Sequence, residues 1–360
     1  MIRVLVAEDS PTARALLVSL LSSEADIAVV GEARTGTEAV EMAMRLAPDL
    51  ITMDVQMPEL DGIQATREIM TRSPRPILIV SSAASGDVEM SLDATRSGAL
   101  MVIAKPQGVH SPAYESDRRQ LISMVRALAS VKVVRRHGAT GTPSSSARPI
   151  TSTRAASRRP LSSAPSSSSA APEVVAIAAS TGGPAALRTI LSRLPRHFPL
   201  PILVVQHIAR GFATGLAHWL SGDSALRVKI AELNELALAG TVYIAPDDRH
   251  LGVRRDQYGE LRIQLDNAAP VGSFRPSATY LFRSCAEVAG RGVVALILTG
   301  MGDDGVEGLR EVHRASGRVL AQDEATSVIY GMPREAHRAG VVDQVIALDD
   351  VARRLAELAS

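Results

Sequence analysis

A segment of 42 residues, 131–172, divides this chain of 360 residues into two parts. Eleven of its residues are serine, most of the others are Ala, Thr, Pro or Arg, and it contains no acidic and no aromatic residue. Such a composition cannot bury enough apolar surface to offset the entropy that is lost on ordering. We therefore expect a disordered linker, with a root-mean-square span of about 35–40 Å, between two folded domains at residues 1–130 and 173–360.

The linker also carries the only strong charge imbalance of the chain. Lys and Arg outnumber Asp and Glu by 7 to 0 in the linker, whereas the counts are 12 to 17 before it and 20 to 21 after it. A basic tether can contact nucleic acid or anionic lipid, but scattered charges also keep a disordered chain solvated. We favour the second interpretation and expect no nucleic-acid partner.

Cysteine content and hydropathy bear on the cellular compartment. Cys285 is the only cysteine, which excludes an intrachain disulfide framework and is typical of a reducing compartment. The first residues reach two acids after a handful of apolar positions, unlike a signal peptide, and no apolar run approaches the length of a membrane span. We expect a cytoplasmic, monomeric protein that does not insert into membranes.

The N-terminal part alternates five times between a short apolar run and a helical pattern. Runs rich in Val, Ile and Leu are typical of parallel strands that are buried on both faces. Five such units predict an α/β domain with a doubly wound parallel sheet. The predicted strands are Val4–Ala7, Ile27–Val30, Leu50–Met53, Ile77–Val80 and Leu100–Ile103, and the predicted helices are Thr12–Leu21, Thr35–Leu46, Gly62–Met70, Val88–Ser97 and Glu115–Ala129.

The C-terminal part shows a second alternation, interrupted by a hairpin pattern. It predicts another mainly parallel α/β sheet with an antiparallel insertion. The predicted strands are Val174–Ala179, Ile202–Gln206, Gly240–Ala245, Val293–Thr299 and a final Arg318–Gln322, with a hairpin of Gly252–Arg255 and Leu261–Gln264. The predicted helices are Ala185–Leu194, Phe212–Leu220, Ser277–Ala289 and Gly305–Ala315.

Polar side chains follow the predicted strands of the N-terminal domain. Glu8 and Asp9 follow the first strand and Asp54 follows the third, and the carboxyl ends of parallel strands meet at one edge of the sheet. Three converging carboxylates predict a divalent cation between them, and oxygen ligands suit Mg²⁺. Ser81 ends the fourth strand and Lys105 follows the fifth, which offers a hydroxyl and an ammonium to phosphoryl oxygens.

These residues stand in stretches that resemble the receiver domains of response regulators. The stretches are Val-Ala-Glu8-Asp9-Ser-Pro, Met-Asp54-Val-Gln-Met-Pro-Glu-Leu-Asp-Gly, Val-Ser81-Ser and Ala-Lys105-Pro. The resemblance implies a flavodoxin-like fold, phosphorylation of Asp54 by a cognate histidine kinase, and Ser81 and Lys105 as switch residues. It also implies Mg²⁺ bound by Asp9, Asp54 and the backbone carbonyl of Gln56, with the assistance of Glu8.

Two positions depart from the receiver pattern. Ser82 follows Ser81, so the switch hydroxyl is ambiguous by one residue. Val102 stands where many receivers carry an aromatic switch residue, which argues against signalling by rotation of an aromatic ring.

A serine, a histidine and an aspartate follow strands of the C-terminal domain. Ser180 follows the first strand, and Gly182 and Gly183 permit a tight turn into a helix. A serine hydroxyl needs a base, and His207 follows the next strand; a third group must orient the imidazole, and Asp304 follows the Val293–Thr299 strand. From these residues alone a serine hydrolase, a nucleotide-binding loop and simple helix capping all stay open, although the loop lacks P-loop and dinucleotide patterns.

Residues 173–360 also resemble the catalytic domain of the chemotaxis protein-glutamate methylesterases, the CheB family. The matching stretches include Ala179-Ser180-Thr-Gly-Gly-Pro, Gln206-His207, Tyr243-Ile-Ala-Pro-Asp-Asp-Arg-His, Arg275-Pro-Ser, Leu298-Thr-Gly-Met-Gly-Asp-Asp304-Gly and Ala321-Gln-Asp-Glu-Ala-Thr-Ser-Val-Ile-Tyr-Gly-Met-Pro-Arg-Glu-Ala. The resemblance implies a Rossmann-like fold, with Ser180 as nucleophile, His207 as base and Asp304 as its orienting acid. It further implies that the backbone N–H of Met301 contributes to the oxyanion hole.

Four positions depart from the methylesterase pattern. Ala178 replaces a glycine, Ile-Ala follows His207 in place of Met-Pro, and Phe274 stands where relatives often have histidine. Asp303 precedes Asp304, so the acid is ambiguous by one residue; Asp304 is favoured because it adjoins Gly305 as in the motif.

The combined resemblance implies an esterase whose activity is controlled by phosphorylation. It would hydrolyse methyl esters of glutamate side chains on chemoreceptor helices, releasing methanol, and would deamidate receptor glutamines, with no cofactor for hydrolysis. The unphosphorylated receiver would cover the esterase cleft. The alternatives are a response regulator whose C-terminal domain is a non-catalytic binding module, or one whose output domain binds nucleotides; a near-neutral α/β domain does not favour binding to nucleic acid.

Overall fold

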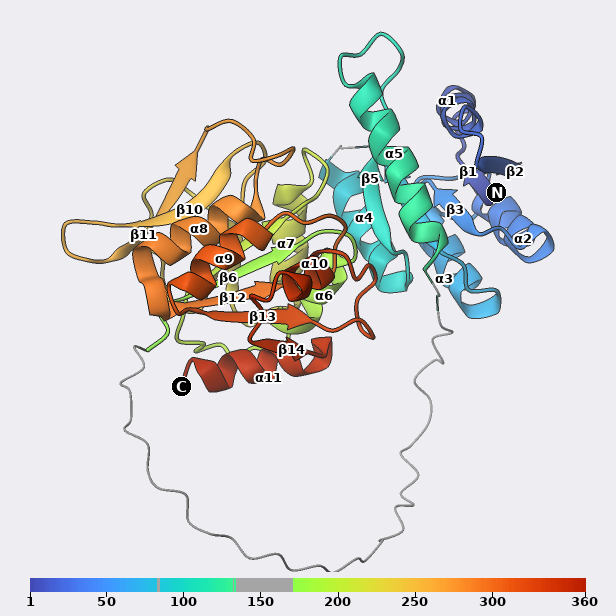
Figure 1. Cartoon of the computed structure of the whole chain (residues 1–360). Coiled ribbons are helices and arrows are strands. Elements are labelled where there is room, and N and C mark those ends of the chain that lie inside the picture. Colours follow the sequence, from blue (N-terminus) through green and yellow to red (C-terminus); the bar gives the residue numbers. More distant parts are fainter. Residues whose placement is uncertain (83–84, 132, 134–170) are drawn as a thin grey trace, which may run out of the picture.

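The computed structural model describes residues 1–82, 85–131, 133 and 171–360. Two α/β domains stand side by side, each built on its own parallel sheet (Figure 1). The predicted linker at 131–172 lies almost wholly outside the described residues, so its expected disorder stays a prediction. No helix in the described ranges is both long enough and apolar enough to cross a bilayer.

The N-terminal domain has a five-stranded parallel sheet in the order β2-β1-β3-β4-β5. This strand order is that of flavodoxin-like folds, as the resemblance to receiver domains implied. The strands are β1 (Ile2–Ala7), β2 (Ile27–Ala33), β3 (Leu50–Met53), β4 (Ile77–Ser81) and β5 (Met101–Ala104). The helices are α1 (Pro11–Ser22), α2 (Gly36–Leu46), α3 (Gly62–Arg72), α4 (Ser85–Ser97) and α5 (Tyr114–Ala129).

Alternate side chains of these strands enter two separate hydrophobic clusters. On one face, α1 and α5 cover residues such as Val4 and Val6 of β1. On the other face, α2, α3 and α4 cover Leu5 and Ala7. Because the helices cover the two faces of the sheet, polar side chains can gather in the loops at the carboxyl ends of the strands.

The C-terminal domain has a seven-stranded parallel sheet in the order β14-β13-β12-β6-β7-β9-β8, and a separate antiparallel hairpin of β10 and β11. The strands are β6 (Val174–Ala179), β7 (Ile202–Gln206), β8 (Arg227–Ile230), β9 (Thr241–Ile244), β10 (His250–Arg255), β11 (Leu261–Asp266), β12 (Val293–Ile297), β13 (Arg318–Gln322) and β14 (Gln344–Ile346). The helices are α6 (Gly183–Leu191), α7 (Ala213–Asp223), α8 (Ala278–Ala289), the 3₁₀ turn η1 (Gly290–Gly292), α9 (Val306–Arg314), α10 (Met332–Arg338) and α11 (Leu348–Leu358).

The direction of chain progression reverses between β6 and β12. From β6 the chain moves outward through β7, and it later returns to the other side of β6 as β12. Such a reversal opens a crevice outside the carboxyl ends of the two strands, where open α/β sheets bind ligands. Helices α6, α7 and α11 cover one face of this sheet, and α8, α9, α10 and the hairpin cover the other.

The two edges of the second sheet correct the sequence predictions. Arg318–Gln322 was expected to be the final strand, but β14 follows it, and β8 was not predicted at all. Both are edge strands; β8 alternates charged and apolar residues and β14 has three residues, so neither forms a continuous apolar run. The helices α10 and α11 were also missed, whereas α6 begins at Gly183 with Pro184 in its first turn, two residues before the predicted start.

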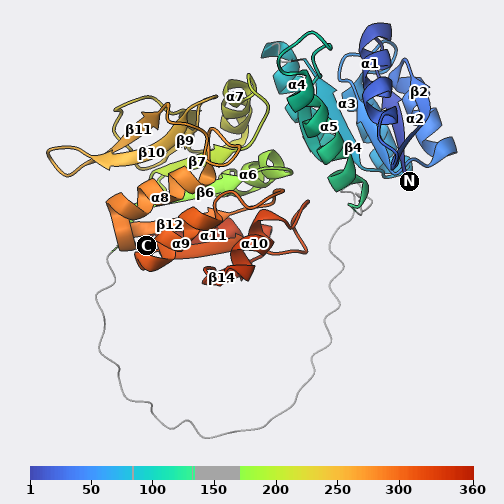
Figure 2. The same cartoon turned by 45° about the horizontal axis from the view of Figure 1, so that its top comes forward.

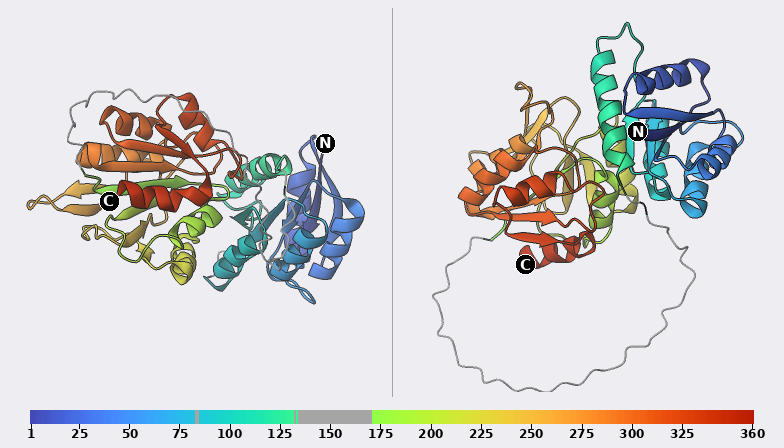
Figure 3. Two further views of the ribbon diagram at one scale, coloured as in Figure 1. Left: turned by 90° about the horizontal axis from the view of Figure 1, so that it is seen from below. Right: turned by 45° about the vertical axis from the view of Figure 1, so that its right-hand side comes forward.

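Helices α4 and α5 lie on the side of the receiver-like domain that faces the C-terminal domain, as Figures 2 and 3 both show. Helix α4 packs on α7 and α6. A Cβ atom placed on Gly215 of α7 would lie 2.4 Å from Cγ1 of Val88, so only glycine permits this approach. Next to it, the indole Nε1 of Trp219 donates a hydrogen bond to Asp93 Oδ1 at 3.0 Å.

Candidate active site

The predicted acidic residues come together at the carboxyl ends of β1 and β3. Glu8, Asp9 and Asp54 each offer a carboxylate oxygen, and these atoms lie within 4.8 Å of one another. Lys105 Nζ donates to Glu8 Oε1 at 2.9 Å and to Asp54 Oδ2 at 2.8 Å. The buried Glu8 Oε2 has no hydrogen-bond partner in the described part of the chain, so the donor set fits a hard cation.

Burial and mutual repulsion shape the electrostatics of this cluster. Burial raises the pKa of Asp54 above its ordinary value, although Lys105 and the N–H groups of Val55 and Gln56 act against it. Burial and the charge of Asp54 raise the pKa of Glu8 in the same way. Burial acts to lower the pKa of Lys105, but its bonds to both carboxylates outweigh this and raise it. A divalent cation would relieve this repulsion between the carboxylates.

The switch positions lie beside this cluster. Ser81 is the buried last residue of β4, and its carbonyl oxygen accepts a bond from the Lys105 N–H at 2.8 Å. Ser82 is half-buried and also has an interaction partner, so the ambiguity between the two hydroxyls stays. Val102 is buried in β5 against the strand partner Ile79.

The second site lies at the reversal between β6 and β12. Ser180 directly follows β6, and its N–H donates to the carbonyl oxygen of Thr299 beyond β12 at 3.0 Å. Gly182, which precedes α6, has a φ of +79°, a left-handed conformation that favours glycine. The tight turn leaves Ser180 on the wall of a cavity that also contains His207.

His207 and Asp304 are joined by a hydrogen bond. The imidazole Nε2 lies 2.9 Å from Asp304 Oδ2. The other ring nitrogen, Nδ1, is buried and has no hydrogen-bond partner among the described residues. Since Nε2 is engaged by the carboxylate, Nδ1 is the nitrogen that is left to exchange a proton with a group in the cavity.

Asp304 is held by the first turn of α8. Its Oδ1 accepts bonds from the Ser277 hydroxyl at 2.8 Å and the Thr279 N–H at 3.0 Å, and its Oδ2 accepts one from the Ala278 N–H at 2.7 Å. Burial acts to raise the pKa of Asp304, but the bond and charge of His207 and the α8 N–H groups outweigh it, so the pKa is lowered to about 2. The carboxylate is therefore ionised at neutral pH.

Asp303 occupies a different environment from its neighbour. It is exposed, and it lines another cavity together with Glu324 and Arg334. No bond from Asp303 to His207 occurs within the described ranges, where the imidazole is bonded to Asp304. This geometry favours Asp304 as the acid partner, as the motif suggested.

Met301 lies on the loop between β12 and α9, beside Ser180. A Cβ atom on the preceding Gly300 would lie 2.7 Å from Ser180 Cβ, so the loop passes against the serine. In the described part of the chain, the Met301 N–H donates no backbone hydrogen bond. Met301 is therefore a candidate for the oxyanion-hole donor that the resemblance implied.

Two residues at this site were not assigned a role from the sequence. The Phe274 ring stacks on the His207 imidazole, with 4.3 Å between ring centroids and 12° between planes. Ser277 bonds to Asp304 and also accepts a bond from the Tyr280 N–H as the cap of α8. Both lie in or next to the Arg275-Pro-Ser stretch, which resembles the methylesterases. Their side-chain contacts depend on the tertiary fold and are not visible in the sequence.

The cavity that contains Ser180 and His207 is lined by residues of both domains. It has a volume of about 660 Å³. The N-terminal domain supplies Met101 from β5 and Ser116, Arg119, Gln120, Ser123 and Met124 from α5. The Thr181 hydroxyl lies 3.8 Å from Met124 Sδ, and the Ser123 hydroxyl lies 3.9 Å from Met301 Sδ. The N-terminal domain thus forms part of the wall of the cavity that contains Ser180.

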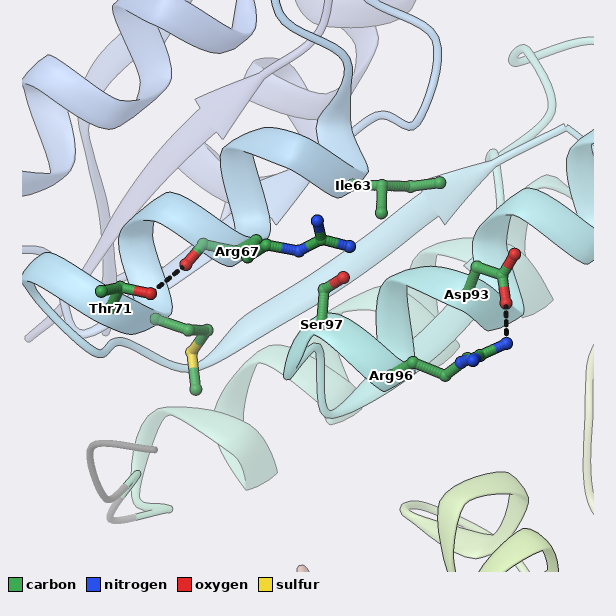
Figure 4. A pocket seen from close by; sticks show the side chains of 7 residues that line it. Ile63, Arg67, Thr71, Asp93, Arg96 and Ser97 are labelled. Atoms are coloured by element: carbon green, nitrogen blue, oxygen red, sulfur yellow. Dashed lines mark hydrogen bonds and ion pairs between the residues drawn. The ribbon is translucent and has the colours of Figure 1, made fainter. Parts of the chain in front are cut away.

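A separate cavity of about 510 Å³ lies between α3 and α4 of the first domain, away from both sites. It is lined by Ile63, Arg67, Met70, Thr71, Asp93, Arg96 and Ser97 (Figure 4). Arg96 points towards Asp93, which also binds Trp219 of the other domain. None of the predicted site residues lines this cavity.

Two families match the two domains. The family model of the response regulator receiver domain matches residues 4–111, and that of the CheB methylesterase matches residues 175–355. The CheB methylesterase catalytic domain of Thermotoga maritima, solved by crystallography, is 39% identical, with a TM-score of 0.51; the match covers 52% of this chain and all of that one.

Similar proteins match over nearly the whole length. The protein-glutamate methylesterase/protein-glutamine glutaminase 4 of Myxococcus xanthus is 53% identical over 98% of this chain and 96% of its own. The protein-glutamate methylesterase/protein-glutamine glutaminase 3 of Anaeromyxobacter dehalogenans is 48% identical over 99% of this chain and 98% of its own. The similarity to these relatives therefore extends over both domains of this chain.

Proposed function

The chain belongs to the CheB methylesterase family, and we propose that it hydrolyses glutamate 5-O-methyl esters on chemoreceptors and deamidates receptor glutamines. The observation that carries the proposal is the bond between His207 and an ionised Asp304, beside Ser180 in one cavity. A non-catalytic binding module would have no use for a buried carboxylate that is held by four donors against a histidine.

In the proposed reaction, Ser180 Oγ attacks the ester carbonyl carbon while His207 Nδ1 takes the hydroxyl proton. Asp304 stabilises the imidazolium through Nε2. The Met301 N–H donates to the carbonyl oxygen as it gains negative charge. The imidazolium then gives its proton to the leaving oxygen, so methanol departs and a glutamyl ester of Ser180 remains.

Water completes the cycle. His207 takes a proton from the water, which attacks the glutamyl ester, and the proton passes to Ser180 Oγ as the new carboxyl group leaves. Deamidation follows the same steps, with ammonia in place of methanol as the leaving group. No step requires a cofactor.

The first domain supplies control. Receiver domains are phosphorylated in an Mg²⁺-dependent manner, with a histidine kinase as phosphodonor. We assign phosphorylation to Asp54 and cation binding to Glu8, Asp9, Asp54 and the Gln56 carbonyl, on the support of the carboxylate cluster. The cation would neutralise charge on the carboxylates and the phosphoryl oxygens, while Lys105 and Ser81 hold those oxygens.

The contact between the domains supports an inhibitory role for the unphosphorylated receiver. Helix α5 lines the cavity of Ser180, so we expect the docked receiver to hinder the approach of a receptor helix to the serine. Phosphorylation would shift the chain towards an undocked form. The proposed substrate and kinase place the reaction in the cytoplasm.

Methanol release from a methylated chemoreceptor tests the proposal. With a phosphodonor and Mg²⁺, the intact chain should release methanol, and Ser180→Ala should reduce turnover by at least about 10³-fold because it cannot form the acyl intermediate. The thermal unfolding midpoint of the variant should stay near that of the wild type. A folded variant that keeps more than about a tenth of the activity would remove Ser180 from this role.

A further inference from the structure

Gln206 connects the two loops that carry the candidate nucleophile and base. It is the last residue of β7, directly before His207, and its side chain is 4% exposed. Its Nε2 donates to the carbonyl oxygen of Ser180 at 2.8 Å and to that of His207 at 2.9 Å. Both acceptors are carbonyl oxygens, so the nitrogen must face them, which fixes the orientation of the amide.

The rest of the amide is enclosed. Oε1 is buried and has no hydrogen-bond partner in the described part of the chain. It lies against the start of α6, where a Cβ atom on Gly183 would be only 2.0 Å away. A buried amide with an unsatisfied oxygen is destabilising, so we expect its two donated bonds to serve a purpose that an apolar side chain of similar size could not.

We propose that Gln206 is a positioning residue for the reaction, and that its amide sets the relative placement of Ser180 and His207. The proposal rests on the function inferred above. The two carbonyl groups belong to the residues whose side chains must exchange a proton, and β6 and β7 are adjacent strands with Ala179 opposite Gln206. A misplacement of about 1 Å can reduce a rate by about 10²-fold. Loss of the one amide donor that both carbonyl groups share should therefore lower kcat.

Replacement by glutamate tests the donated bonds. In Gln206→Glu the ionised carboxylate cannot donate and faces two carbonyl oxygens, so kcat on methylated receptor should fall by at least about tenfold while KM stays within about threefold. Burial and the lack of donors should raise the pKa of the new carboxyl above its ordinary value of about 4.3. Protonation restores one donor, so the ratio of variant to wild-type kcat should rise as pH falls from about 8 to about 5.5.

The matched variants separate positioning from packing. The leucine side chain of Gln206→Leu has no donor at any pH. The ratio of its kcat to that of the wild type should therefore stay low and constant between about pH 8 and about pH 5.5. Gln264→Glu on β11, whose amide lies 3.5 Å from the Tyr280 hydroxyl, should keep wild-type kcat. The titratable or charged groups that line the cavity with Gln206 are His207, which is bonded to Asp304, and Arg119 and Arg275; all are present in every protein compared.

A steric perturbation gives a second test on the intact, phosphorylated chain. Gly183 does not have a left-handed φ, so Gly183→Ala should act mainly by displacing the Gln206 amide. It should lower kcat by about tenfold more in the wild type than in Gln206→Ala, where the amide is gone. Ala179 Cβ, 2.8 Å from the added atom, is close to it in both backgrounds, so its effect cancels when the two are compared.

The outcomes distinguish this inference from the proposed function. A wild-type chain that releases no methanol would contradict the function. A wild-type chain that is active, with Gln206→Glu either unaffected or showing the same flat ratio as Gln206→Leu, would overturn the role of Gln206 alone. Additive effects of Gly183→Ala and Gln206→Ala would overturn it as well.

Discussion

The Asp304 carboxylate accepts hydrogen bonds from four groups, of which one is the imidazole of His207 and three belong to the start of α8. A carboxylate with this many donors stays ionised and keeps one orientation. It thereby selects the nitrogen of His207 that is left for Ser180. The neighbouring Asp303 makes none of these bonds within the described ranges and is exposed.

This difference predicts opposite sensitivity of the two aspartates. Asp304→Asn offers His207 an amide and disturbs the tautomer, so turnover should fall by about 10³- to 10⁴-fold. Asp303→Asn should stay within about threefold of the wild type. Methanol release by the two purified variants checks the assignment, and the reverse ranking would transfer the role to Asp303.

At the scale of elements, α8 is the support of the acid. Its first N–H groups lack partners within the helix and carry partial positive charge, and they point at Asp304. Ser277 joins the two, since its hydroxyl donates to Asp304 and accepts from the Tyr280 N–H. The acid and the helix end therefore stabilise each other. This interaction should contribute a measurable part of the free energy of unfolding.

The pKa of Asp304 predicts how that stability depends on pH. The folded-state pKa of about 2 lies below the ordinary value of 3.8. The ionised carboxylate should thus contribute about 2 kcal/mol to the free energy of unfolding above about pH 4, and this should be lost as pH falls through about 2.

Urea unfolding of the wild type and of Asp304→Asn measures this contribution. The difference between their free energies of unfolding should be largest at neutral pH and shrink as pH falls from about 5 to about 2.5. Comparing the two proteins cancels contributions from Asp54 and Glu8, whose pKa values are raised. A difference that does not change with pH would contradict the lowered pKa.

At the scale of the whole molecule, α4 and α5 of the receiver domain both contact the esterase domain. Helix α4 packs on α6 and α7, and α5 lines the cavity of Ser180. The proposed phosphorylation site, Asp54, and the proposed nucleophile, Ser180, lie on different domains, so we expect phosphorylation to act through this contact. A coupling of about 1–3 kcal/mol, or about 5- to 150-fold, is usual for such switches.

Control by the receiver gives a prediction about the intact chain and its parts. Acetyl phosphate with Mg²⁺ should raise esterase activity by about 5- to 150-fold, and Asp54→Asn should abolish the rise. A fragment of residues 173–360 should be active without a phosphodonor, since nothing covers its cleft. Methanol release compares the three. A fragment that is no more active than the unphosphorylated chain would show that the receiver does not inhibit.

The α4–α7 contact gives a second prediction at this scale. Trp219 is the only tryptophan of the chain, is 8% exposed and binds Asp93, so its emission should report docking. Asp93→Ala removes this bond and should weaken docking by about 1 kcal/mol. Basal activity without phosphodonor should rise by about fivefold, with a red shift of the emission.

Glu41→Ala on the exposed side of α2 is the matched control and should change neither signal. If Asp93→Ala shifts the emission but leaves basal activity unchanged, the α4–α7 contact does not restrain the esterase. Restoration of wild-type activity by Asp93→Asn would show that the acceptor oxygen, and not the charge, is what Trp219 requires.

The linear order of residues was enough to predict both α/β domains and most central strands. Runs such as Leu50–Met53 and Ile202–Gln206 are buried on both faces, so their apolar character is continuous and visible in the sequence. It was also enough to nominate Ser180, His207 and Asp304, because polar residues directly after such runs must lie at one edge of a parallel sheet. Short edge strands such as β14 carry no comparable signal.

Only the tertiary structure decided which of two neighbouring aspartates bonds to His207, and which residues of the first domain lie beside the candidate active site. Asp303 and Asp304 have the same side chain, and only the approach of α8 distinguishes them, through bonds between residues that are more than twenty positions apart. Likewise, no local pattern shows that Met124 of one domain lies beside Thr181 of the other. Strand formation follows local apolar periodicity, whereas these contacts follow from how whole elements pack, which no short stretch of sequence encodes.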